Sequence, residues 1–174
     1  MSKGQSIDNL NKIPSIEFQN IFRNVVENYP QAAIDVSSRR PFVDTNQLVE
    51  HFNNYLTNLD RESKVKVLQL HPDLAGKLAR DGELTAESAQ EQAGAGLNQI
   101  SNEQYEQLNQ MNEQYKEKFG FPFVICVRET NKIEAILRGI TVRLQNGGND
   151  ELDTGIDEVK KICRLRIGQI IDLQ

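Results

Sequence analysis

The sequence predicts an all-α protein that folds as one compact multi-helix domain over residues 1–174. Apolar residues recur at spacings of three and four almost from end to end, which is typical of amphipathic helices. A chain of 174 residues fits one ordinary domain, and no repeat, low-complexity tract or long linker divides it. The 38% of hydrophobic residues can fill a core without forming a membrane-spanning run. We therefore expect a soluble globular protein.

In the first half of the chain, two apolar stripes predict core helices. The first helix is expected to begin with Ser15 as its N-cap, directly after Pro14, and to end before Pro30. Its buried stripe is expected to consist of Phe18, Ile21, Phe22 and Val25. The second helix spans residues 48–59 by the same spacing.

In the second half, three further helices are predicted. A long helix with an apolar stripe over residues 105–119 is expected to open at a capping box made by Ser101 and Gln104. Another stripe covers residues 133–144, and after the turn-forming Asn146–Asn149 a last helix carries apolar residues from 152 to 170. The two ends of the chain are therefore expected to pack.

The segment of residues 121–128 is the exception to this helical pattern. It is a short apolar run of high β propensity, and periodicity alone cannot assign it. We expect it to be extended or irregular, and buried.

Charge and cysteine content narrow the classes of function. The formal net charge of −5, with no basic face, argues against a nucleic-acid partner and favours a small ligand or a protein. Cys126 and Cys163 stand singly, without a CxxC or Cys/His spacing, so we expect reduced packing residues in an intracellular protein and no metal site. The N-terminus lacks the apolar stretch of a secretory signal, and the C-terminus does not match a peroxisomal SKL-type ending.

Of the two histidines, His71 is the candidate for chemistry. His51 falls within the second helix, where a surface or helix-packing role is expected. His71 follows an apolar run and precedes Pro72, which restricts its backbone and predicts a sharp helix end, with Asp73 as a cap for the next helix. The ring either faces a cavity or is a buried structural histidine bonded to a carbonyl group. The sequence leaves both alternatives open.

Residues 84–92 can be read in two registers. If Ser88 is an N-cap, Ser88 and Glu91 form a capping box with a structural purpose. If Thr85 is the N-cap, Ser88, Glu91 and Gln92 share one helix face close to a helix N-terminus, where an anion is favoured. Spacing alone does not choose between the registers.

Three ordered motifs give the chain a family resemblance. They are His71-Pro-Asp-Leu-Ala-Gly76, Leu84-Thr85…Ser88…Glu91-Gln92 and Phe119-Gly-Phe-Pro-Phe-Val-Ile-Cys126. Together they resemble the decarboxylases of 2-oxo-4-hydroxy-4-carboxy-5-ureidoimidazoline (OHCU) of the urate degradation pathway, and weaker matches extend the similarity over nearly the whole chain. Ala86 departs from the family, which often has proline there, but Thr85 can still cap the helix.

The resemblance implies an all-α homodimer that converts OHCU into (S)-allantoin without a cofactor, since the substrate carries its own electron sink. It implies catalytic roles for His71, as proton donor, and for Glu91, which would orient ring or ureido N–H groups. The implied substrate contacts are Pro72, Ser88, Ala89, Gln90, Glu91 and Gln92, with a wall offering backbone groups from Phe123, Val124, Ile125, Cys126 and Val127.

Two other functions compete with this one. The chain would be a helical interaction module if His71 and Glu91 served only as core and cap, or it would act on another ureido or hydroxy acid, because a fold does not fix chemistry. We expect neither nucleic acid nor membrane as a partner. The expected compartment is the cytoplasm, with the peroxisome as the alternative.

Overall fold

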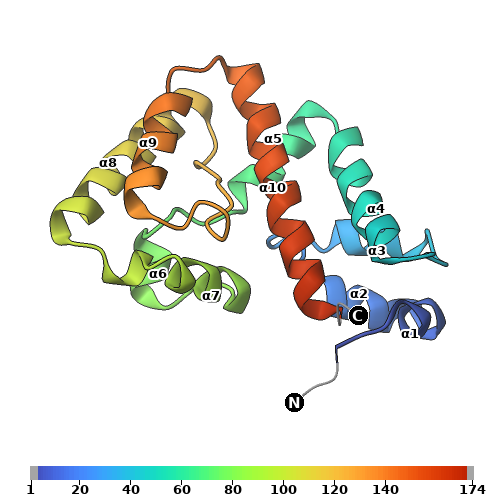
Figure 1. The fold of residues 1–174 in the computed structure, drawn as a ribbon. Helices are drawn as coiled ribbons and strands as arrows, with labels where there is room; N and C mark the ends of the chain where they lie inside the picture. Colours follow the sequence, from blue (N-terminus) through green and yellow to red (C-terminus); the bar gives the residue numbers. More distant parts are fainter. Residues whose placement is uncertain (1–3, 172–174) are drawn as a thin grey trace. The chain divides into compact units, whose positions relative to one another are not determined.

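The computed structural model describes residues 4–171 and is built from helices (Figure 1). No strand occurs among these residues, and one isolated bridge joins Gln5 to Ile171. The all-α prediction is confirmed. None of the described helices is long and apolar enough to cross a membrane. The elements are α1 (Ile7–Lys12), α2 (Ser15–Phe22), α3 (Gln31–Ser37), α4 (Thr45–Asn58), α5 (Arg61–Gln69), α6 (Lys77–Asp81), α7 (Ala86–Gly94), η1 (Leu97–Gln99, a 3-10 turn), α8 (Asn102–Phe119), α9 (Ile133–Arg143) and α10 (Gly148–Ile170).

The chain forms two compact units, of which the first contains the described parts of Met1–Ser63 and Lys160–Gln174. Its core is aromatic: the ring of Phe18 stacks on Phe22 with centroids 4.5 Å apart. His51 packs its ring against Phe42, as expected for a helix-packing histidine. The Gln5 N–H donates to the carbonyl oxygen of Ile170 at 2.8 Å, so the described ends of the chain do pack together.

The second unit, Lys64–Val159, is organised around a buried carboxylate. Glu151 of α10 is 0% exposed and accepts hydrogen bonds from the Tyr115 hydroxyl of α8 (2.5 Å), from Arg143 of α9 and from Asn146 (3.0 Å). Burial, reinforced by the bond to Glu151, raises the pKa of Tyr115 far above its ordinary value, so this hydroxyl keeps its proton. The Glu151 carboxylate thereby links α8, α9 and α10.

The start of α2 differs from the prediction. Pro14 is the N-cap and Ser15 is already helical, so the assignment of Ser15 as N-cap is wrong. The Ser15 hydroxyl instead accepts a hydrogen bond from Arg40 at 2.7 Å. The helix also ends at Phe22, well before Pro30, and a run of turns follows.

Two other predictions from the sequence, at the start of α8 and after its end, agree with the structure. The capping box of Ser101 and Gln104 opens α8 as predicted, and the left-handed Gly120 (φ 80°) ends it. Residues 121–128 form neither helix nor strand, as predicted. Residues 121–127 are buried except for the half-buried Ile125, whereas Arg128 is exposed, so the prediction of burial is wrong for Arg128. The short helices α1, α3, α5 and α6 were not predicted, because each presents too few apolar residues for a visible stripe.

We expect Ser101→Ala to lower the free energy of unfolding by about 1 kcal/mol, because the N–H of Gln104 loses its capping partner. Gln110→Ala, at an exposed position in the middle of α8, is the control and should change stability little. Denaturant unfolding followed by circular dichroism measures both. Equal effects would show that the capping box does not contribute.

Candidate active site

His71 lies on a turn directly after α5. Its N–H donates to the carbonyl oxygen of Leu68 at 3.1 Å, so the chain leaves the helix sharply before Pro72, as predicted. The residue is 8% exposed, and its Nδ1 lies 2.9 Å from the carbonyl oxygen of Val67. A carbonyl oxygen can only accept a hydrogen bond, so Nδ1 carries a proton and Nε2 is the nitrogen that can gain or lose one. This bond, which a structural histidine would also make, therefore fixes the tautomer that acid/base catalysis needs.

Gln92 of α7 holds the turn that follows His71. Its Oε1 accepts the N–H of Ala75 at 2.9 Å, and its Nε2 donates to the carbonyl oxygen of Asp73 at 3.4 Å. Ala75 has φ 49°, a left-handed conformation that costs free energy for a residue with a side chain and persists only where its surroundings fix it. The amide of Gln92, which is 6% exposed, supplies that fixation.

Helix α8 holds the same turn from a second direction. Asn112 donates to the carbonyl oxygen of Leu74 at 3.2 Å, and Lys116 forms an ion pair with Asp73 at 2.7 Å. The prediction that Asp73 caps the next helix is wrong, because α6 has Gly76 as its N-cap and no side chain bonds its first turn. The Asp73 carboxylate is committed to Lys116 instead.

The structure decides the register of α7. Thr85 is the N-cap, and its side chain accepts the N–H of Ser88 at 3.2 Å, so the helix has already begun at Ala86. The alternative in which Ser88 caps the helix and pairs with Glu91 is therefore wrong. Ser88 (5% exposed) and Gln92 are buried, and Glu91 is half-buried. At spacings of three and four, these residues share one face of α7.

Other predicted contact residues of this region have different surroundings. Pro72 is half-buried beside His71, whereas Ala89 and Gln90 are exposed on α7. The Nε2 group of Gln69, at the end of α5, donates to the carbonyl oxygen of Gly120 at 2.9 Å. That bond brings the start of the irregular segment to the end of the helix that carries the histidine turn.

The backbone of residues 123–127 is partly occupied by bonds within the protein. The Cys126 N–H donates to Glu158 at 3.0 Å, and the carbonyl oxygen of Val124 accepts from Arg143 at 2.7 Å. The guanidinium of Arg143 also lies 4.4 Å from the ring centroid of Phe123. These bonds occupy the N–H of Cys126 and the carbonyl oxygen of Val124, so a backbone contact with a ligand would use other groups of the wall.

Both cysteines are free and buried, as packing residues should be. Burial raises the pKa of the Cys126 thiol, which therefore stays protonated and unreactive near neutral pH. The Cys163 thiol donates to the carbonyl oxygen of Val25 at 3.2 Å within the first unit. Within residues 4–171, no group of His, Cys, Asp and Glu side chains is arranged to hold a metal ion.

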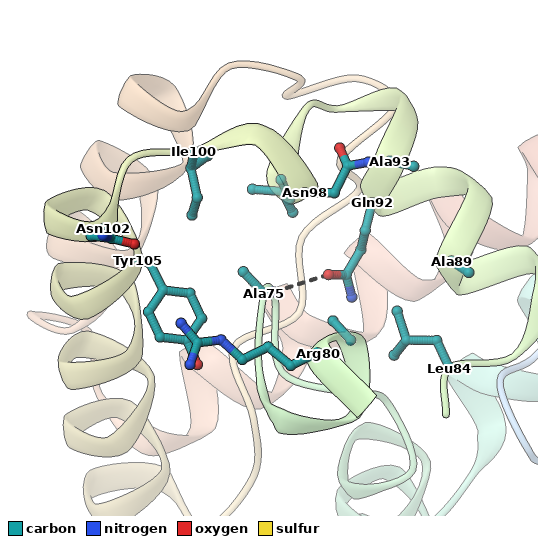
Figure 2. A pocket seen from close by; sticks show the side chains of 12 residues that line it. Ala75, Arg80, Leu84, Ala89, Gln92, Ala93, Asn98, Ile100, Asn102 and Tyr105 are labelled. Atoms are coloured by element: carbon teal, nitrogen blue, oxygen red, sulfur yellow. Dashed lines mark hydrogen bonds between the residues drawn. The ribbon is translucent and has the colours of Figure 1, made fainter. Parts of the chain in front are cut away.

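Sequence reasoning missed a hollow beside this site. Figure 2 shows the side chains of α6, α7, η1 and α8 that enclose it, with Arg80 lying over the ring of Tyr105 and Gln92 pointing toward Ala75. Arg80 and Tyr105 come from helices that are separated in the sequence, so no spacing pattern connects them.

The fold and the turn define a class: an all-α protein in which a buried histidine of fixed tautomer lies on a turn held by a polar helix face, an arrangement suited to proton transfer on a small molecule. Residues 11–168 match the family described as OHCU decarboxylase. The chain belongs to the OHCU decarboxylase family.

Curated relatives with this name match the chain over nearly their whole length. The 2-oxo-4-hydroxy-4-carboxy-5-ureidoimidazoline decarboxylase of Amia calva is 43% identical over 93% of this chain and 92% of its own. That of Xenopus laevis is 40% identical over 92% and 91%. The protein of that name from Haloferax volcanii is 32% identical over 94% and 95%.

Two solved structures share the fold at 20% identity. A crystal structure of (S)-allantoin synthase superposes with a TM-score of 0.77 over 97% of this chain, which spans 55% of that longer chain. A crystal structure of OHCU decarboxylase in the presence of (S)-allantoin superposes with a TM-score of 0.69 over 86% of this chain and 96% of the other. At this identity the likeness supports the all-α fold alone.

We expect Gln92→Leu to lower the free energy of unfolding by about 1–3 kcal/mol, because the buried N–H of Ala75 loses its acceptor. Gln90→Leu is the matched control, since it makes the same change at an exposed position of α7. Chemical denaturation of both variants measures the difference. If the two variants were equally stable, Gln92 would not be holding the turn.

Proposed function

We propose that the chain catalyses the decarboxylation of OHCU to (S)-allantoin without a cofactor. The observation that carries the proposal is the bond from His71 to the Val67 carbonyl oxygen, in a chain of this family. It fixes one tautomer of a buried imidazole on a turn that Gln92 and Asn112 hold in place.

The substrate itself explains why no cofactor is needed. Its C4 carries a hydroxyl and the departing carboxylate, and a C5=N bond lies next to it. When CO₂ leaves, the electron pair of the broken bond forms C4=C5 and the ring nitrogen takes up a proton. The C4 hydroxyl then loses its proton to become a carbonyl, and C5 gains one. The balance is one CO₂ released and one proton consumed, with no oxidation or reduction.

His71 is assigned the delivery of the proton to C5. Imidazole has a reference pKa near neutrality, and a positioned acid of this kind typically contributes ~10²–10⁴-fold to the rate. The imidazolium form donates through Nε2, since Nδ1 is bonded to Val67. Delivery from one side of the ring gives a single enantiomer, which we assign as (S) from the family resemblance.

Glu91 is assigned to the ureido and ring N–H groups of the substrate, because its carboxylate can accept hydrogen bonds from them and so orient them. Ser88 completes the polar edge, and the N-terminal end of α7 favours the negative charge of the substrate. Gln92 contributes mainly by positioning the turn, because both ends of its amide are bonded to that turn. Pro72 and the wall of residues 123–127 would enclose the ring.

The remaining parts of the proposal concern assembly and location. We assign the chain to the cytoplasm, which fits its free, buried cysteines. The C-terminal tripeptide, residues 172–174, lies outside the described residues. The homodimer rests on the family resemblance. One functional domain over residues 1–174 is supported by a family match that runs from residue 11 to 168.

The direct test adds the purified chain to freshly generated OHCU in buffer with a chelator and follows ultraviolet absorbance and optical rotation. We expect faster loss of OHCU than in buffer alone and an optically active product. If the chain did not accelerate the loss of OHCU, the helical interaction module would be favoured. If the reaction were accelerated only after a metal ion was added, the cofactor-free reaction would be excluded. Related ureido and hydroxy acids, tested in parallel, report whether OHCU is the preferred substrate.

We expect His71→Asn to fold, to bind substrate somewhat more weakly and to lose at least ~10²-fold in rate, because an amide cannot exchange a proton near neutral pH. The remaining product should be closer to racemic, since protonation would occur from either side. Thermal melting checks the fold, and polarimetry checks the product. A folded variant with wild-type rate and pure (S) product would return His71 to a structural role.

We expect Glu91→Gln to leave the melting temperature nearly unchanged and to reduce turnover strongly, because α7 is capped by Thr85 and does not need Glu91 as a capping partner. Thr85→Ala is the counterpart and should lose about 0.5–2 kcal/mol of stability through the missing cap. Melting curves and turnover are compared for both variants. Destabilisation by Glu91→Gln with normal turnover would contradict the assignment.

A further inference from the structure

A hollow of about 410 Å³ lies in the second unit between α6, α7, η1 and α8. This volume is within the range of small-molecule sites. Its lining includes Ala89 and Gln92 of the predicted substrate contacts, but it does not include His71, Ser88 or Glu91 (Figure 2). The hollow therefore borders the face of α7 that carries the proposed catalytic groups and shares Gln92 with it.

Arg80 gives the hollow its charge. It is the only charged side chain among the lining residues, and its guanidinium carbon lies 3.5 Å from the ring centroid of Tyr105. No carboxylate in the part of the chain that the structure describes forms an ion pair with it. Stacking on the ring occupies a face of the guanidinium and leaves its N–H edge for a carboxylate.

Two amides lie on the same lining. Asn98 comes from η1 and Asn102 from the start of α8, and Figure 2 shows both at the border of the hollow. Both side chains are exposed, and neither makes a hydrogen bond with a described residue. Each amide offers both N–H donors and a carbonyl acceptor, which is the complement of another amide or of a ureido group.

We propose that this hollow is a second, regulatory site that binds a small ureido carboxylate. The carboxylate pairs with Arg80, the ureido group with Asn98 and Asn102, and the apolar part of the ligand packs on the alanine and leucine side chains of the lining. The site is electrostatically selective, because the lining holds one positive charge and no negative charge.

Gln92 connects the hollow to the histidine turn. It lines the hollow, and it also bonds the N–H of Ala75 at 2.9 Å and the carbonyl oxygen of Asp73 at 3.4 Å. Ala75 lines the hollow too and has the strained φ of 49°. A ligand touching this pair changes the free energy of the turn that carries His71. Binding is independent of the identity of the substrate, and only the effect on turnover rests on the proposed function.

The test uses N-carbamoylglycine as the probe, with its uncharged amide as the matched control, in isothermal titration calorimetry without OHCU. We expect the carboxylate to bind and the amide to bind about tenfold or more weakly, as loss of one charge-assisted contact predicts. Arg80→Gln should weaken carboxylate binding by a similar factor. Arg138→Gln, which removes the same charge from an exposed position of α9, should not.

Two further variants separate this hollow from the catalytic face. Ala93→Phe, which fills the hollow, should abolish binding in a protein whose circular dichroism is unchanged, while Glu91→Gln should leave binding intact. The site would be overturned if the wild-type protein did not bind the probe, or if it bound the uncharged amide equally well. It would also be overturned if Arg80→Gln and Arg138→Gln lost binding equally, or if Glu91→Gln alone lost it.

The regulatory part has its own readout. On titration of the probe into the wild-type protein, the backbone amide signal of Ala75 should shift in ¹H–¹⁵N spectra, and turnover of OHCU should change over the same concentration range. Arg80→Gln should suppress both responses at that concentration. Binding without a shift at Ala75 or a change in turnover would reduce the hollow to a binding site without regulation.

Discussion

The structure depends on one constraint: irregular backbone that is buried in a helical protein must have its polar groups bonded by side chains from the surrounding helices. Gln92 and Asn112 do this for the histidine turn. Arg143 and Glu158 do it for residues 123–127. Each of these side chains comes from a helix, so the helices hold the irregular segments in place.

The buried Glu151 carboxylate is subject to a related constraint, because a buried charge also needs partners that bond it. An unpaired charge in the interior would be strongly destabilising, and Glu151 is compensated by Arg143, Tyr115 and Asn146. Arg143 in turn bonds the carbonyl oxygen of Val124. The ion pair between Arg143 and Glu151 thus joins α9 to α10, the Tyr115 hydroxyl attaches α8 to the same carboxylate, and Arg143 fixes the backbone at Val124.

For His71, the structural and the catalytic interpretations make use of the same hydrogen bond. The bond to Val67 satisfies a buried ring nitrogen and at the same time selects the tautomer in which Nε2 exchanges protons. Gln92, Asn112 and Lys116 fix the turn that carries His71, and they hold its ring in place under either interpretation. Family membership agrees with the catalytic interpretation.

The sequence by itself determined what depends on neighbours along the chain: the helical class, the capping box at Ser101, the helix end before Pro72 and the irregular, buried segment after Gly120. It left the register of α7 open, because Thr85 and Ser88 both satisfy the local capping rules. Tertiary structure decided where partners are distant. The commitment of Asp73 to Lys116, the hold of Gln92 on Ala75 and the approach of Arg80 to Tyr105 join residues from different helices, and no local spacing encodes such contacts.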